Sequence, residues 1–237
     1  KPSSTLRVMT ALSFVNLEKT IGIMFKNKDL LAQSLTHRSA VRETRSLGHN
    51  ERLEFLGDAV LELVTTDYLF HIGQRTEGEM TNLRSALVNR ENLSSVAKEI
   101  SLGEYLYLSK GEDRSGGRDK DSTLSNALEA LIGALYLDQG FEAASQFCNE
   151  FILTRLQALQ AAGKHVDEKS SFQEKAQATE GLTPHYEVLE QEGPDHEKTF
   201  TCGVFIGEEK IAEGTGNSKQ KAETAAAAAG LKAKGWN

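Results

Sequence analysis

Cysteine is scarce in this sequence, and its two occurrences, Cys148 and Cys202, lie far apart. This spacing provides neither a disulfide framework nor the closely spaced ligand pairs of a zinc site. No apolar run is long enough to span a membrane, and the polar residues 1–5 do not have the pattern of a signal peptide. We therefore expect a globular protein of the reducing cytoplasm.

An excess of positive charge is also missing. The 237 residues include 27 Lys and Arg against 34 Asp and Glu, which gives a net charge of −7. A protein that holds nucleic acid on a broadly basic surface has the opposite balance. Any contact with phosphate must therefore depend on local clusters of basic residues. The length is sufficient for one large domain or two ordinary ones.

One stretch, residues 50–64, combines acidic residues with many apolar ones. At helical spacing, Glu51, Glu54 and Asp58 lie at positions i, i+3 and i+7 and form a single acidic stripe. Apolar residues cover most of the remaining circumference, which predicts a buried helix. Because buried, unpaired carboxylates are costly, we expect the stripe to face an internal cleft or a metal site.

The rest of residues 1–159 has helical spacing and no strand alternation, so we expect an all-α domain. One helix is predicted over residues 122–137, with Asn126 and Glu129 on one face, and another over residues 141–159. A helical stripe also runs through residues 83–100. The Gly-rich charged segment 110–120 is either a phosphate-binding loop or a flexible connector.

The composition changes at residues 160–169, which we interpret as a linker between domains 1–159 and 170–237. After the linker, a helical segment precedes three segments with strand patterns and an Ala-rich helix that Ser218 caps. This order, α-β-β-β-α, predicts a small two-layer α+β domain. Lys219 and Lys221 stand at the N-terminus of the last helix, where phosphate is favoured; solvated surface lysines are the alternative.

The acidic residues indicate a kind of chemistry. Oxygen ligands from two helices, without His or Cys, favour Mg²⁺ or Mn²⁺ over zinc. Such a site suits attack of water on a phosphodiester. A nucleophilic triad is not evident, because His37 and His49 have no Ser or Cys partner in a recognisable motif.

Three motifs resemble those of the bacterial ribonuclease III family. They are Asn50-Glu51-Arg52-Leu53-Glu54-Phe55-Leu56-Gly57-Asp58, Thr36-His37-Arg38-Ser39 and the segment Leu-Glu-Ala-Leu-Ile-Gly-Ala-Leu-Tyr-Leu-Asp over residues 128–138. Residues 184–186, 193–196, 214–216 and 218–223 resemble a double-stranded-RNA-binding domain. The resemblance covers nearly the whole chain. It implies an all-α endonuclease domain followed by a small α+β double-stranded-RNA-binding domain.

The activity that this resemblance implies is Mg²⁺-dependent cleavage of both strands of duplex RNA by a homodimer, in RNA processing, with Mn²⁺ as a substitute metal. Products carry 5′-phosphates, 3′-hydroxyls and short 3′ overhangs. By position, the metal-site residues are Glu54, Asp58, Asn126 and Glu129, with Asp58 and Glu129 closest to the catalytic step. The resemblance also places Glu51 and Glu77 in the catalytic valley and Phe55 at the dimer interface.

The same resemblance assigns RNA contacts in the C-terminal domain. They fall on the first helix, on a loop tip and on the start of the last helix, at Gln173, Glu174, Gln177, His196, Ser218, Lys219 and Lys221. Contacts of this kind recognise the A-form shape and the 2′-hydroxyls of RNA rather than its sequence.

Asn126 departs from the family pattern, which has Asp at this position. Asn keeps the shape and one carbonyl oxygen but removes a negative charge. We therefore expect a weaker metal site and impaired catalysis, with folding and RNA binding retained. Two origins fit: a deliberate replacement made to trap an RNA complex, or a natural variant that tolerates Asn. The alternative functions are a duplex-RNA-binding dimer that does not cut and a hydrolase of small phosphate esters.

Overall fold

The computed structural model describes residues 14–41, 48–161, 168–194 and 198–236. It divides the chain into two compact units, Lys1–His165 and Val166–Asn237. Of the predicted linker, residues 160–161 end one helix, residues 168–169 begin the next, and residues 162–167 lie outside the described part. Among the described residues, no helix is both long enough and apolar enough to cross a membrane.

The first unit is helical, as the sequence predicts. After a helix at residues 14–21 come α2 (Lys28–Ser34), η1 (Arg38–Ala40), α3 (Glu51–His71), α4 (Glu77–Val88), α5 (Arg90–Glu99), η2 (Leu102–Tyr105), α6 (Lys110–Arg114), α7 (Asp121–Gln139), α8 (Phe141–Phe151), η3 (Leu153–Arg155) and α9 (Leu156–Ala161). An isolated bridge joins Thr36 to Tyr107 without forming a sheet.

The single helix predicted over residues 141–159 is wrong, because the chain forms α8, η3 and α9 there. Arg155 explains the break: its guanidinium contacts Asn92, Ser95 (2.9 Å) and Glu99 of α5. These tertiary contacts outweigh the continuous helical pattern. The helical stripe over 83–100 is likewise divided at Asn89, whose side chain caps α5.

The Gly-rich segment 110–120 is not a simple connector. It contains the short helix α6, and Arg118 fastens it to the neighbouring backbone. The Arg118 guanidinium donates to the carbonyls of Gly103 (3.0 Å) and Leu106 (2.7 Å) and pairs with Asp113 (2.6 Å). These bonds hold the segment between η2 and α7 in one conformation.

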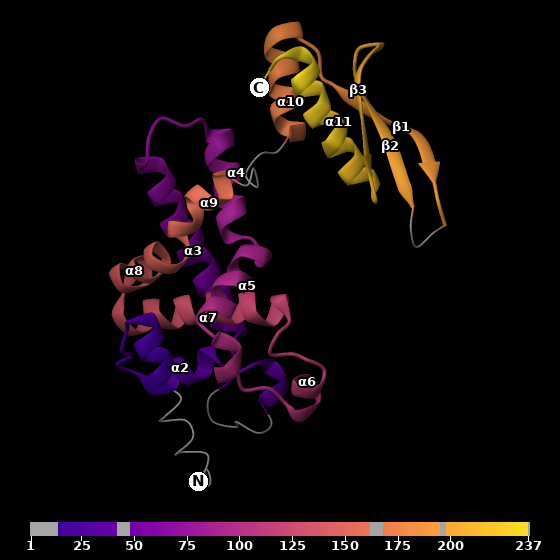
Figure 1. Cartoon of the computed structure of the whole chain (residues 1–237). Coiled ribbons are helices and arrows are strands. Elements are labelled where there is room, and N and C mark those ends of the chain that lie inside the picture. Colours follow the sequence, from indigo (N-terminus) through magenta and orange to yellow (C-terminus); the bar gives the residue numbers. More distant parts are fainter. Residues whose placement is uncertain (1–13, 42–47, 162–167, 195–197, 237) are drawn as a thin grey trace. The chain divides into compact units, whose positions relative to one another are not determined.

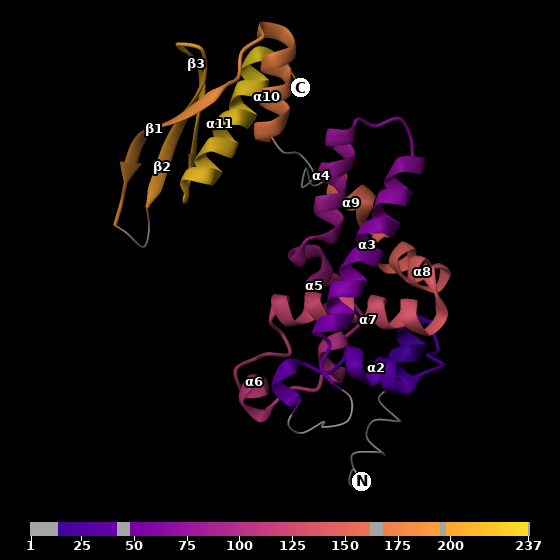
Figure 2. The same ribbon diagram turned by 180° about the vertical axis from the view of Figure 1, so that it is seen from behind.

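Helix α7 packs against α2, α3, α5 and α8, and Figures 1 and 2 show that it lies across α3. The crossing is close because a glycine stands on each side. A Cβ on Gly57 would lie 1.8 Å from the carbonyl oxygen of Glu129, and a Cβ on Gly133 would lie 2.2 Å from that of Leu53. Any side chain at these two positions would push the helices apart.

Helix α3 is only partly buried, in contrast to the prediction. Its buried face, which includes Leu61, packs in the core of the unit. Phe55, Leu63 and Phe70, however, are 81%, 57% and 67% exposed. The helix therefore has two apolar faces, and the helices that the structure describes cover only one of them. Such an exposed apolar stripe marks a contact surface.

The second unit has the predicted α-β-β-β-α order. Its elements are α10 (Glu168–Glu180), β1 (His185–Glu192), β2 (Thr199–Ile206), β3 (Glu209–Gly216) and α11 (Lys219–Lys234). The strands form an antiparallel sheet in the order β1-β2-β3, and both helices lie on one of its faces (Figure 1). Phe172, Val204, Ile206 and Ala226 fill the core between these layers.

Candidate active site and RNA-binding surface

Three of the predicted metal-site carboxylates meet where α3 crosses α7. Glu54 and Asp58 occupy the turn of α3 on either side of Gly57, and Glu129 is the α7 residue whose carbonyl contacts that glycine. The close crossing thus brings carboxylates from residues more than seventy positions apart into one another's electrostatic field. Glu129 is half-buried, and the Asp58 side chain is exposed.

The electrostatics of these residues show how crowded the negative charge is. The pKa of Glu129 rises to about 7, first because burial disfavours its charged form and then because Asp58 and Glu54 lie nearby. Burial also raises the pKa of Glu54, with further contributions from Glu51 and Asp58. Perturbed carboxyl groups that gather in one place are typical of catalytic sites.

Asn126 belongs to the same cluster. Its side chain hydrogen-bonds the Glu54 carboxyl and so opposes the rise in the pKa of that group. The hydroxyl of Ser125 lies 3.3 Å from the Asn126 Oδ1, which leaves the amide NH₂ to face Glu54. Asn126 thus acts as a hydrogen-bond donor to a carboxylate, a role that a charged Asp cannot fill.

The donor chemistry of this cluster fits a hard divalent cation. Its side-chain donors are carboxylate and amide oxygens, and a bound cation would relieve the repulsion that raises the pKa of Glu129. The side chains do not, however, form a complete ligand set as they stand. Within the described ranges, no three His, Cys, Asp or Glu residues are arranged to hold a metal ion.

Glu51, at the start of α3, contacts the Thr36–Ser39 motif. Its carboxylate pairs with the Arg38 guanidinium at 3.3 Å and lies 3.5 Å from the His49 ring. The same motif is joined to the segment before α6, because the Ser109 N–H donates to the Ser39 hydroxyl at 3.0 Å. The motif therefore contributes to structure, and it holds the start of α3 in place.

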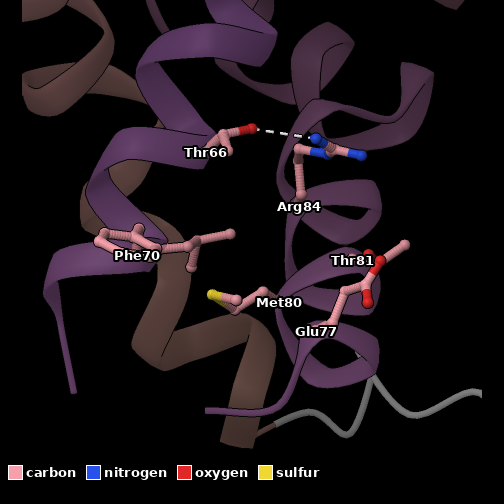
Figure 3. Close-up of a pocket in the computed structure, with 7 residues that line it drawn as sticks. Thr66, Phe70, Glu77, Met80, Thr81 and Arg84 are labelled. Atoms are coloured by element: carbon pink, nitrogen blue, oxygen red, sulfur yellow. Dashed lines mark hydrogen bonds between the residues drawn. The ribbon is translucent and has the colours of Figure 1, made fainter. Parts of the chain in front are cut away.

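Glu77 and Phe55 also lie outside the cluster. Glu77 begins α4 and lines a pocket of about 200 Å³ together with Phe70, Met80 and Arg84, as Figure 3 shows. This pocket lies beside the C-terminal part of α3, whereas Glu54 and Phe55 lie near its N-terminus. One chain therefore does not bring Glu77 to the other acidic residues.

Comparisons with known proteins agree with this arrangement. A ribonuclease-III-like family model matches residues 27–156, and a double-stranded RNA binding motif matches residues 168–233. The chain is 46% identical to Ribonuclease 3 of Campylobacter fetus subsp. fetus, over 89% of this chain and 93% of that protein. It is 43% identical to Ribonuclease 3 of Dehalococcoides mccartyi, over 91% and 92% of the two chains.

The chain belongs to the ribonuclease III family. A solved structure agrees: the ribonuclease III nuclease domain of Campylobacter jejuni is 44% identical, with a TM-score of 0.55, and the match covers 59% of this chain and 95% of that one. The chain is thus a ribonuclease III-type endoribonuclease with a double-stranded RNA binding motif, as the sequence motifs predict.

In the RNA binding motif of this ribonuclease III chain, the predicted contact residues on α10 are accessible. Gln173, Glu174 and Gln177 are exposed on α10. Ser218 accepts a hydrogen bond from the Lys221 N–H at 3.3 Å and caps α11. The predicted contact His196 lies outside the described residues.

Lys219 and Lys221 are exposed in the first turn of α11. Neither forms an ion pair with another residue in the part of the chain that the structure describes. Two exposed ammonium groups without an ion pair therefore stand at the positive end of the helix dipole, an arrangement that favours phosphate.

Asp138, the last acid of the third ribonuclease III motif, has a structural role that sequence reasoning missed. Its carboxylate accepts the backbone N–H groups of Lys26 and Asn27, both at 2.7 Å. It thereby ties the end of α7 to the start of α2. The sequence contains no signal for this contact, because its partners are backbone groups more than 110 residues away.

Proposed function

We propose that this chain is a metal-dependent endoribonuclease that cuts both strands of double-stranded RNA, as a homodimer, during RNA processing in the cytoplasm. The products are 5′-phosphates and 3′-hydroxyls with short 3′ overhangs. The observation that carries the proposal is the meeting of Glu54, Asp58 and Glu129 at the glycine crossing of α3 and α7, in a chain with an RNA binding motif.

The metal in this proposal is Mg²⁺, with Mn²⁺ as a substitute. Glu54, Asp58, Asn126 and Glu129 would hold it through their side-chain oxygens. A cation bound there lowers the pKa of water and offsets the charge that develops on the phosphodiester oxygens. Asp58 and Glu129 lie closest to the reaction. Without a cation, burial and the neighbouring carboxylates raise the pKa of Glu129 to about 7, and a bound cation would favour its charged form.

Asn126 reduces the negative charge of this metal site. It supplies one neutral oxygen where the family pattern has a carboxylate, and it donates its amide to Glu54. We propose that it weakens metal binding and slows cleavage, without disturbing the fold or the RNA contacts of the second unit.

The test is cleavage of a long perfect RNA duplex with Mg²⁺ by the chain and by Asn126→Asp, with duplex binding followed in parallel. We expect both proteins to bind alike and Asn126→Asp to cut about tenfold faster or more, the effect of one charged ligand. Equal cleavage would make Asn126 a tolerated variant. Binding without cleavage by either protein would favour a non-cleaving duplex-RNA-binding dimer, the alternative that Asn126 supports.

The exposed stripe of α3 supports the homodimer. If two copies pair these helices in antiparallel fashion, the N-terminal part of one helix meets the C-terminal part of the other. Phe55, which is 81% exposed, would then reach the pocket beside Phe70 and Met80 of the second copy (Figure 3). Glu77 lines this pocket, so the same pairing would bring Glu77 of the partner subunit towards Glu54 and Asp58.

The second unit would bind the duplex by its shape. We assign minor-groove contacts to Gln173, Glu174 and Gln177 of α10 and to His196, and phosphate contacts to Lys219 and Lys221 beside the Ser218 cap. The few lysines of this acidic unit make the binding weak, and its dependence on salt should be shallow because few phosphates are neutralised.

A further inference from the structure

Arg90 lies beside the carboxylate cluster without being part of it. It is the first residue of α5, which packs against α7. At helical spacing, Arg90, Ser94 and Lys98 share one face of α5. That face lies along α7, because Lys98 pairs with Asp121 of α7 at 2.6 Å.

The position of Arg90 on this face brings its charge close to the active site. The guanidinium acts electrostatically both on Asp121, at the start of α7, and on Glu129, two turns further along. It therefore lies within electrostatic reach of both acids. Asn126 lies between the two acids along α7.

Arg90 is near acidic side chains, but in the described part of the chain it forms no close ion pair with any of them. The side chain is exposed, and among the described residues no hydrogen bond or ion pair joins it to another group. Lys98, on the same face, is by contrast paired with Asp121. Arg90 thus has a free guanidinium whose planar donors match a phosphate group.

An RNA strand that approaches the cluster meets strong repulsion. Glu54, Asp58 and Glu129 gather negative charge in one place, and each nucleotide adds another negative charge. A cation at the edge of the cluster offsets this repulsion and fixes where the backbone lies. Arg90 has the position, the exposure and the unpaired charge for this task.

We propose that Arg90 binds a phosphate of the RNA strand next to the carboxylate cluster and so positions the duplex over the active site. The inference rests on the proposed function, because it requires that duplex RNA reach this cluster. It adds a contact from the nuclease unit to those of the RNA binding motif. Arg90 is a substrate-binding residue in this proposal and takes no part in proton transfer.

The test compares the chain with Arg90→Ala and Arg90→Lys in duplex-RNA binding without divalent metal, at several salt concentrations. Losing one phosphate contact should weaken binding roughly fivefold and lower the slope of log affinity against log salt by about 0.7–0.9 per protomer. Arg90→Lys keeps the charge and should retain most of the slope. Where the chain cuts RNA with Mg²⁺, Arg90→Ala should raise KM and change kcat little.

Lys19→Ala is the control, because Lys19 is exposed on the helix at residues 14–21 and its loss changes the net charge equally. It should leave both binding and slope unchanged. If the chain and Arg90→Ala had the same slope of log affinity against log salt, the inference would be overturned. It would also be overturned if Arg90→Ala changed only the pH dependence of cleavage or the stability of the fold. If the unaltered chain does not bind duplex RNA at all, the proposed function itself fails. That failure is distinct from a result in which the unaltered chain binds and Arg90→Ala binds equally well.

Discussion

At the scale of a single residue, the α3–α7 crossing changes the pKa of Glu129, and through it the pH dependence of stability. This pKa of about 7 means that, between the ordinary value of 4.5 and 7, the folded protein holds a proton that the unfolded chain releases. Stability must therefore fall as the pH rises through this window, because the folded state binds more protons. The loss remains above pH 7, where the charged side chain stays partly buried beside Asp58 and Glu54.

Replacing Glu129 by Gln should remove this penalty. Without divalent metal, Glu129→Gln should be more stable than the chain at pH 8 by about 2 kcal/mol, after allowance for solvent screening, and the gain should shrink towards pH 4.5. Urea unfolding at both pH values, in chelator, measures the difference. Glu150→Gln, an exposed change on α8, is the control and should show no such trend. A gain that does not depend on pH would contradict this account.

The sequence predicts which acidic residues lie on one helix face, but it does not predict which residues they contact. The spacing of Glu51, Glu54 and Asp58 correctly indicates one face of a helix. It does not reveal that Glu51 is engaged by Arg38 while Glu54 receives the Asn126 amide. These pairings depend on how segments distant in sequence meet, which local patterns do not encode.

At the scale of elements, the crossing of α3 and α7 depends on two missing side chains. Gly57→Ala would place a methyl group 1.8 Å from the Glu129 carbonyl oxygen. Neither backbone can move without disturbing the core, so we expect a loss of roughly 3 kcal/mol or more. Thermal or urea unfolding measures it, and cleavage should fall as the carboxylates separate.

Gly111→Ala is the matched control for this change. Gly111 is also helical, but a Cβ there would meet nothing nearer than the Ser109 hydroxyl at 3.9 Å. Alanine favours helix over glycine, so stability should stay level or rise by up to about 1 kcal/mol. If both alanine variants behaved alike, close backbone contact would not be what holds the crossing together.

Elements with a strong periodic pattern were predicted well, and elements shaped by distant contacts were not. Helix α7 spans Asp121–Gln139 where residues 122–137 are expected from the sequence, and the strands of the second unit follow in the predicted order between two helices. The break after Phe151 was missed because Arg155 makes its contacts with residues about sixty positions earlier. The sequence does not predict the exposed face of α3. A helix that is apolar all round can be covered by its own chain or by a second molecule, and the pattern does not distinguish the two.

At the scale of the whole molecule, the exposed stripe of α3 should decide the oligomeric state. Phe55→Ala removes an aromatic ring from each side of the proposed interface, and we expect a loss of about 2–3 kcal/mol per ring in dimer stability. Sedimentation at several protein concentrations measures the dissociation constant. Met24→Ala, which alters a side chain that is 75% exposed elsewhere, should leave it unchanged. A dimer of equal strength in both variants would place the interface elsewhere.

The central position of α7 also has a consequence during synthesis on the ribosome. The helices that α7 contacts include α2, α3 and α5, all made before it, and Asp138 near its end holds Lys26 and Asn27 across a loop of more than 110 residues. Until residue 139 has left the ribosome, the nascent nuclease unit lacks the helix that joins its parts. Until then, the apolar faces of the helices made before α7 stay exposed to solvent. Aggregation competes with folding at this stage.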